Sequence, residues 1–233
     1  MKNYWKIAVM LVAASVAWSC SDDDDDAFQP AQNNPIEVRG SGENASLYTI
    51  SSGKITADIT DFGATLVRLY VPDATGHVAD VVLGYDDVNA YATQPGHLGG
   101  TVGRNANRIK KGTFSLGNKK VHLGINNNAN NLHSGPDYFD LRIWSVESYQ
   151  SDRISFRLES PDGDQGFPGN AVIRVTYAVE DTSLKLYYDA VCDQDTVFNM
   201  TNHSYFNLAG HDATQQAMEQ TLMMPARTFT VAD

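Results

Sequence analysis

The chain has 233 residues, of which 42% are apolar and 19% are charged, so it is long enough to bury the core of one large domain or two small ones. Its formal net charge is −11. Nucleic acids and anionic lipid headgroups are therefore not expected as partners, because both carry the same sign of charge. The charge says nothing for or against a neutral ligand.

Residues 1–19 are predicted to be a targeting segment. Lys2 and Lys6 form its positive start, and the apolar run 7–17 is too short to span a bilayer as a mature helix. Its removal takes away two basic residues and no acidic ones, which leaves 15 basic against 28 acidic residues and a net charge of −13. A lipoprotein signal peptide is the favoured interpretation, and an ordinary signal peptide is the alternative.

Cys20 follows this segment, and its surroundings resemble the lipobox of bacterial lipoproteins. Small residues, Ala17 and Ser19, stand at two of the three positions before it. We therefore expect Cys20 to be lipidated and to anchor the protein in the bacterial cell envelope, with no other membrane contact. Residues 20–35 are expected to be a solvated tether, because Asp22–Asp26 repel one another. The acidic run has two interpretations that the sequence does not separate: a simple spacer on the periplasmic face, or a signal for export to the outer cell surface.

From residue 36 onward the sequence has the pattern of antiparallel strands. Apolar and polar residues alternate over 55–59, 154–158, 171–179 and 184–190, as in strands that bury one face. A hairpin is predicted around Gly117-Asn118, and a short helical turn near 88–91. The expected fold class is all-β, a large antiparallel β-sandwich over residues 36–233.

Three long loops interrupt this pattern, at residues 92–111, 126–140 and 160–170, and binding residues tend to lie on such loops. The candidates, from two of these loops and a later segment, are Arg104, Asn107, Arg108, His133 and His203. A histidine can donate and accept protons near neutral pH, and an arginine offers a planar set of donors suited to hydroxyl oxygens. This set predicts a pocket for a polyhydroxylated ligand.

Other kinds of site are not expected. No two histidines have the spacing of zinc ligands, and Cys192 is the only cysteine besides Cys20. A serine hydrolase is not expected either, because the chain lacks a nucleophile elbow. The remaining histidines are interpreted as structural: His77, His97, His122 and His211.

Five motifs follow one another along the chain: Asp61–Leu66, Gly103–Ile109, Asn131–His133, Ser160–Asn170 and Thr201–Leu208. Together they resemble the aldose 1-epimerase (galactose mutarotase) family, from about Ile36 to the last residue. The resemblance implies a galactose mutarotase-like supersandwich, a small aldose sugar as partner, and no metal or organic cofactor. We expect the protein to be a monomer.

The resemblance also implies roles for matching residues. His203 corresponds to the general acid that protonates the ring oxygen as the sugar opens. Sugar oxygens would be bound by Asn107, Arg108, His133, Ser204 and Tyr205. The family's general base is a glutamate near the C-terminus, in a segment that would lie beyond Asp233, so we expect the domain to be incomplete at that end.

The implied reaction is the interconversion of α and β anomers of hexoses such as galactose or glucose. It requires His133, His203, Asn107 and Arg108 to converge on one cleft. A non-catalytic sugar-binding surface lipoprotein of the same fold is the alternative, and a structural β-domain of a polysaccharide-handling assembly is a third interpretation. An in-frame continuation that carries the missing acidic residues would favour the enzyme.

Overall fold

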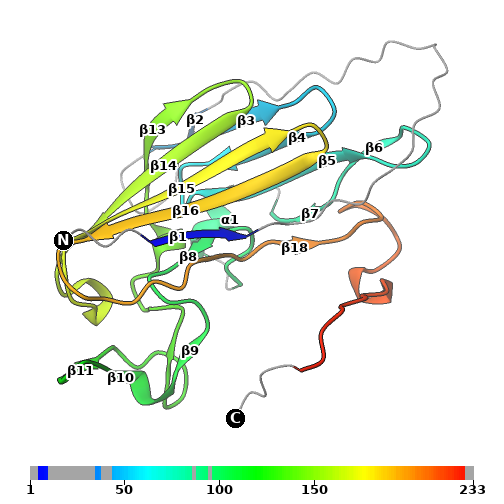
Figure 1. Ribbon diagram of the computed structural model, residues 1–233. Coiled ribbons are helices and arrows are strands. Elements are labelled where there is room, and N and C mark those ends of the chain that lie inside the picture. Colours follow the sequence, from blue (N-terminus) through cyan, green and yellow to red (C-terminus); the bar gives the residue numbers. More distant parts are fainter. Residues whose placement is uncertain (1–4, 10–34, 38–43, 86–87, 94–95, 229–233) are drawn as a thin grey trace.

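The structure is a computed structural model that describes residues 5–9, 35–37, 44–85, 88–93 and 96–228. The expected lipidation site Cys20 and nearly all of the tether lie outside the described residues. The described chain is built around two five-stranded antiparallel sheets that form the two layers of a sandwich (Figure 1). The expected all-β sandwich is confirmed.

The first sheet contains the longest strands. In spatial order it consists of β1 (Trp5–Val9), β16 (Ser183–Cys192), β15 (Ala171–Glu180), β14 (Arg153–Ser160) and β13 (Ser145–Tyr149). The alternation predicted from the sequence is confirmed: along β15, Ala171, Ile173, Val175 and Tyr177 are buried, while the residues between them are partly exposed. The long ladder of β15 and β16 turns at residues 181–182.

The second sheet has the order β2 (Pro35–Glu37), β3 (Asn44–Ser51), β4 (Thr56–Thr60), β5 (Thr65–Pro72) and β6 (Val78–Asp80). Its central strand β4 differs from the expected half-buried strand, because all five of its residues are buried. One of them is the polar residue Asp58, whose charge is satisfied by two partners. Its carboxylate accepts a hydrogen bond from the Thr49 hydroxyl at 2.7 Å and pairs with Arg68 at 3.4 Å.

One apolar core joins the two sheets. Ile50, Ile59 and Leu66 from the second sheet and Phe156 and Ile173 from the first belong to a single cluster of buried side chains. Burial of apolar surface of this kind supplies most of the favourable free energy of folding. The core therefore provides a rigid support for the loops at the edge of the sandwich.

β1 lies inside the segment that is expected to be a signal peptide. It pairs antiparallel with β16, with Trp5 opposite Ala190 and Val9 opposite Leu186. Cleavage after residue 19 would therefore remove the edge strand of the first sheet and leave one side of β16 without a backbone partner. The signal peptide itself stays a prediction.

Short elements connect the sheets and carry the loops. Four two-stranded ladders pair β7 (Val82–Leu83) with β18 (Tyr205–Phe206), β8 (Thr101–Val102) with β17 (Thr201–Asn202), β9 (Arg108–Ile109) with β12 (Asn131–Leu132), and β10 (Thr113–Leu116) with β11 (Lys119–His122). The last pair is the predicted hairpin. Short 3₁₀ turns cover Lys110–Gly112, Phe139–Leu141, Asp164–Gly166 and Ala217–Glu219. The expected helical turn is α1 (Val88–Thr93), and no helix within the described ranges is long and apolar enough to cross a membrane.

Candidate functional site

The β8–β17 ladder brings His203 next to a loop that lies about one hundred residues earlier in the chain. Thr201 pairs with Val102 and Asn202 pairs with Thr101. Just beyond the ladder, the backbone N–H of His203 donates to the carbonyl of Gly100 at 2.9 Å, and the N–H of Gly99 donates to the carbonyl of His203 at 3.1 Å. The segment that carries His97 is therefore fixed beside His203.

The β9–β12 ladder does the same for Asn107 and His133. The backbone N–H of His133 donates to the carbonyl of Asn107 at 2.9 Å, and the backbone N–H of Asn107 donates to Nδ1 of His133 at 3.0 Å. The neighbouring Ser134 hydroxyl accepts from the N–H of Asn105 and donates to its carbonyl. The His133 ring is thus held by backbone groups on the facing segment.

Three imidazoles face one another where these two ladders meet. The ring centroids of His133 and His203 are 5.2 Å apart, and that of His97 lies 5.1 Å from His133 and 5.8 Å from His203. The structure therefore brings together the two histidines singled out from the sequence. His97, interpreted from the sequence as structural, is the third member of the cluster.

Backbone strain is concentrated in this cluster. Four of the nine described non-glycine residues with positive φ are found here: His97 (55°), Asn107 (61°), His133 (53°) and Ser134 (63°). The left-handed region costs about 1–2 kcal/mol for such a residue, and residues held in it tend to occur at functional sites. The surrounding ladders must hold these residues in place, which favours a site that is formed before a ligand binds.

His133 is neutral at physiological pH. Burial lowers its pKa, and the nearby rings of His97 and His203 lower it further, to about 4. Because Nδ1 accepts the hydrogen bond from Asn107, the proton of the neutral ring is on Nε2. His133 can therefore donate a hydrogen bond from Nε2 to a ligand oxygen.

His97 has the opposite electrostatic surroundings. Its Nδ1 lies 2.7 Å from Oδ2 of Asp140, a carboxylate that is 7% exposed. The hydrogen bond to Asp140 raises the pKa of His97 despite the effect of burial. A proton in this cluster is therefore held at His97 in preference to His133.

The remaining site candidates surround the imidazoles. Arg108 is exposed, and it donates to the side-chain oxygens of Asn127 at 3.1 Å and Asn107 at 3.3 Å. The ring of Tyr205 is 47% exposed, with its centroid 5.3 Å from that of His203. Ser204 differs from these residues, because its Oγ is buried and has no hydrogen-bond partner among the described residues.

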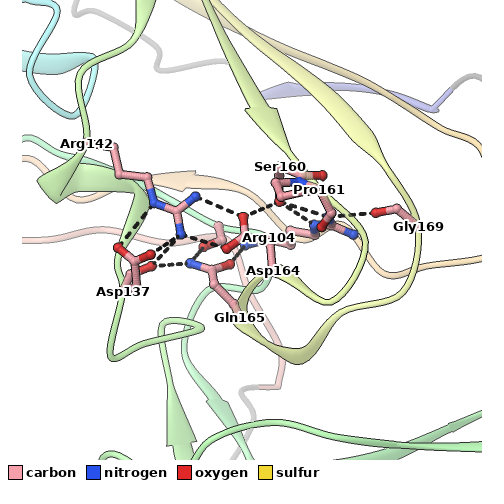
Figure 2. A network of polar contacts seen from close by, with 9 residues as sticks. Arg104, Asp137, Arg142, Ser160, Pro161, Asp164, Gln165 and Gly169 are labelled. Carbon is pink, nitrogen blue, oxygen red and sulfur yellow. Dashed lines mark hydrogen bonds and ion pairs between the residues drawn. The ribbon is translucent and has the colours of Figure 1, made fainter.

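Arg104 does not belong to this site, which corrects its grouping with Arg108. Its side chain is completely buried and donates hydrogen bonds into the 160–170 loop (Figure 2). The acceptors are the Ser160 hydroxyl and the carbonyls of Ser160, Pro161, Pro168 and Gly169, together with the Thr196 hydroxyl. Arg104 therefore stabilises the loop instead of binding a ligand.

A second arginine extends this network. Arg142 makes two hydrogen bonds of 2.8 Å to the two carboxylate oxygens of Asp164 and three more to the carboxylate and backbone carbonyl of Asp137 (Figure 2). Burial acts to raise the pKa of Asp164, but the hydrogen bonds from Arg142 and Ser160 outweigh burial and lower the pKa. The 160–170 loop, which was a candidate binding loop, thus has its polar groups engaged in internal contacts.

The sequence contains little that would have identified His97. The residue lies in a glycine-rich loop, outside the five motifs, and its partner Asp140 is 43 residues away. The glycines flanking it hint at an unusual backbone, and Gly99 has a φ of 68°. Nothing local in the sequence indicates that this loop meets His133 and His203.

Comparisons with known proteins bear on this cluster. Residues 46–233 match the family model described as Aldose 1-epimerase. Galactose mutarotase from Homo sapiens is 36% identical over 197 residues, which are 84% of this chain and 57% of that protein. Aldose 1-epimerase from Escherichia coli is 36% identical over 174 residues, which are 74% of this chain and 50% of that protein.

Solved structures agree with these sequence relatives. An aldose epimerase homologue from C. elegans matches with a TM-score of 0.67 at 37% identity, covering 70% of this chain and 51% of that chain. A galactose 1-epimerase from Lactobacillus acidophilus matches with a TM-score of 0.66 at 29% identity, covering 75% of this chain and 52% of that chain. This chain spans about half the length of the proteins it matches.

Proposed function

This chain belongs to the aldose 1-epimerase family, and on that premise we propose that its imidazole cluster binds an aldose and interconverts the α and β anomers. The observation that carries the proposal is the position of His133 and His203, with ring centroids 5.2 Å apart and Asn107 and Arg108 beside them. Hydrogen-bond donors and a titratable group on one small surface are what a polyhydroxylated ligand and a proton transfer require.

The reaction needs two proton transfers that balance. As the C1–O5 bond breaks, a general base takes the proton of O1–H and a general acid gives a proton to O5, so the open aldehyde has the same atoms as the ring. After rotation about C1–C2, O5 adds to the other face of the carbonyl and both transfers reverse. Each acid–base group in such a reaction typically contributes about 10²–10⁴-fold to the rate.

We assign the proton transfer at O5 to His203 and sugar binding to His133. A pKa of about 4 leaves His133 without a second proton at neutral pH, so it is a poor acid. Its Nε2–H is nevertheless a good donor to a sugar hydroxyl. Arg108 and Asn107 supply further hydrogen-bonding groups, and the exposed Tyr205 ring offers an apolar surface for a sugar face.

Polarimetry of freshly dissolved α-D-galactose and α-D-glucose with the purified chain tests this proposal. Galactose binding that is retained in His122→Gln, with any equilibration above the buffer rate lost in His203→Gln, is the expected result. His122 is a suitable control because it lies on β11, where it contacts Thr113. A folded chain that neither binds galactose nor speeds its equilibration would contradict the proposal.

A non-catalytic sugar-binding role is the second candidate. Within the described residues, the carboxylate that bears on the His133 ring is Asp140, and Asp140 is already bound to His97. A site of this composition has donors for sugar hydroxyls without an unengaged carboxylate to act as base. Galactose binding by a folded chain with no acceleration over buffer would favour this role.

We further propose that the protein acts as a monomer anchored in the bacterial cell envelope through a lipidated Cys20. The support is the signal-like segment 1–19, the small residues before Cys20 and the acidic run after it. Membrane fractionation of cells that express the chain tests this proposal. Cys20→Ala is expected to release soluble protein or to stall processing, and unchanged membrane association would contradict lipidation.

A further inference from the structure

His97 lies between the two histidines to which the proposed function assigns roles. Its ring is edge-on to His133, with an interplanar angle of 64°, and is tilted by 53° to His203. The side chain is 20% exposed, so it is partly open to solvent on the same surface. A ligand large enough to touch both His133 and His203 would therefore lie within reach of His97.

The orientation of the His97 ring is fixed from behind by Asp140. Nδ1 of His97 and Oδ2 of Asp140 are 2.7 Å apart, and Oδ1 of Asp140 is buried with no hydrogen-bond partner in the described chain. The backbone beside His97 packs tightly on the same carboxylate: a Cβ added at Gly100 would lie 2.6 Å from Cβ of Asp140. With Nδ1 engaged, Nε2 is the ring nitrogen left for a ligand.

A buried carboxylate that serves only to fill space would be costly, because its negative charge has lost its water. His97 is the group that compensates Asp140, and it can do so fully only when it is protonated. The other titratable groups that face the His97 ring are Tyr138, His133 and His203, with centroid distances of 4.7, 5.1 and 5.8 Å. Asp140 is the carboxylate that contacts this ring, and its hydrogen bond raises the pKa of His97 despite the effect of burial.

We propose that His97 is a third sugar-contacting residue of this site, which donates a hydrogen bond from Nε2 to a ligand hydroxyl, and that Asp140 is its positioning residue. The inference rests on the proposed function, because it takes the ligand to be an aldose. A protonated His97 offers two N–H groups, one to Asp140 and one to the ligand. Hydrogen bonds from charged donors are stronger than neutral ones, so this contact contributes to affinity and orients the sugar.

Histidine NMR on the complete chain tests the inference directly. The Cε1–Hε1 signals of His97, His133 and His203 are assigned by backbone experiments and followed as α/β-galactose is added. We expect galactose to shift the signals of His97 and His133 together, and the His97→Gln variant to bind galactose roughly ten-fold more weakly or worse. His122→Gln is the matched control, and its affinity should equal that of the wild type.

Asp140→Asn separates positioning from a purely structural role. This variant keeps the size of the side chain and removes the charge, so His97 should release its proton at a lower pH than in the wild type. The pH at which galactose affinity starts to fall should therefore be lower in the variant than in the wild type. A structural role would lower the melting temperature of Asp140→Asn and leave the pH profile of binding unchanged, which would overturn the assignment of Asp140.

The outcomes distinguish this inference from the proposed function. A His133 signal that moves with galactose beside a stationary His97 signal, and His97→Gln with wild-type affinity, would overturn the inference and leave the proposed function standing. Galactose that moves none of the three signals would overturn both. If His97→Gln does not fold, the wild-type titration decides, because it needs no variant.

Discussion

Arg104 and Arg108 stand four residues apart in one motif, and the structure gives them opposite surroundings. Arg104 is completely buried, and its guanidinium donates to carbonyl and hydroxyl oxygens of the 160–170 loop and Thr196 (Figure 2). Arg108 is exposed and donates to two asparagine side chains beside the imidazole cluster. The hydrogen-bond donors of Arg104 are used inside the fold, whereas Arg108 adds donors to an exposed surface.

This difference shows that residue type within a motif does not decide its role. What decides it is whether the hydrogen-bonding capacity of the side chain is used inside the fold or is left for a ligand. Figure 2 shows a region where the polar groups are paired with one another. In the imidazole cluster, Nδ1 of His133 and Nδ1 of His97 are engaged within the fold, which leaves Nε2 of each ring to bond a ligand. The predictions below test this contrast.

The largest effect is expected from Arg104→Met. The substitution keeps the approximate length of the side chain but removes the hydrogen bonds to the carbonyls of Ser160, Pro161, Pro168 and Gly169 and the charge that attracts Asp164. Breaking a buried charged network of this kind costs about 3–5 kcal/mol. Urea unfolding should show this loss, while Arg108→Met should change stability by less than about 0.5 kcal/mol. Equal stabilities of the two variants would contradict the contrast between these arginines.

The next effect is a loss of catalytic rate with little change in stability. His203→Gln keeps a polar side chain, so the fold should remain, but it removes the group proposed to transfer the proton at O5. We expect the accelerated part of galactose mutarotation to fall by about 10²–10⁴-fold, with a melting temperature close to that of the wild type. Polarimetry and a thermal melt on the same preparation measure both. A variant that keeps the full rate would show that another group transfers this proton.

A smaller effect is expected on ligand affinity. Arg108→Ala removes an exposed donor next to Asn107, which should weaken galactose binding by roughly ten-fold with little change in stability. Arg153→Ala is the control, because Arg153 is also an exposed arginine and pairs weakly, at 4.0 Å, with Glu180 on the first sheet. Calorimetric titration with galactose measures both variants. If Arg153→Ala reduced affinity as much as Arg108→Ala, the effect would reflect general charge and not a contact.

The strands that could be predicted are those in which one local pattern determines burial. Along β14, β15 and β16 the apolar residues alternate because one face meets the core, and the sequence shows this directly. β4 escapes the same rule, since its polar residues Thr56, Asp58 and Thr60 are also buried, and the Asp58 carboxylate is satisfied there by Thr49 and Arg68. A pairing between side chains on different strands leaves no periodic signal in the chain.

The site could be predicted only as far as its motifs reach. His133 and His203 lie in motifs that resemble a known family, and the structure brings their rings together. His97 depends on the β8–β17 ladder, which joins segments about one hundred residues apart, and on a left-handed backbone at His97 itself. Neither feature is encoded by local composition, so a third imidazole becomes visible only when the loops are placed in space.

The smallest expected effect is on stability at mildly acidic pH. It should arise in the imidazole cluster and not in the Arg104 network. His133 has a pKa of about 4 in the folded chain, below the value of about 6.5 for an unfolded histidine. Between these values the unfolded chain binds the proton more tightly. The contribution of His133 is therefore complete above about pH 6.5 and is lost as the pH falls toward 4. Because the ring is partly exposed, we expect a loss of no more than about 1 kcal/mol.

Urea unfolding between pH 7.5 and 4.5 checks this effect in the wild type and in His133→Gln. Stability should fall less steeply with acid in the variant, because glutamine has no proton to gain, and His122→Gln should follow the wild type. The Arg104 network should contribute little to this slope, since burial acts to raise the pKa of Asp164 but the hydrogen bonds from Arg142 and Ser160 outweigh it and hold the pKa below its usual value. Identical slopes in wild type and His133→Gln would mean that His133 is already solvated like an unfolded histidine. The cluster would then lack the desolvated donor on which sugar binding by His133 depends.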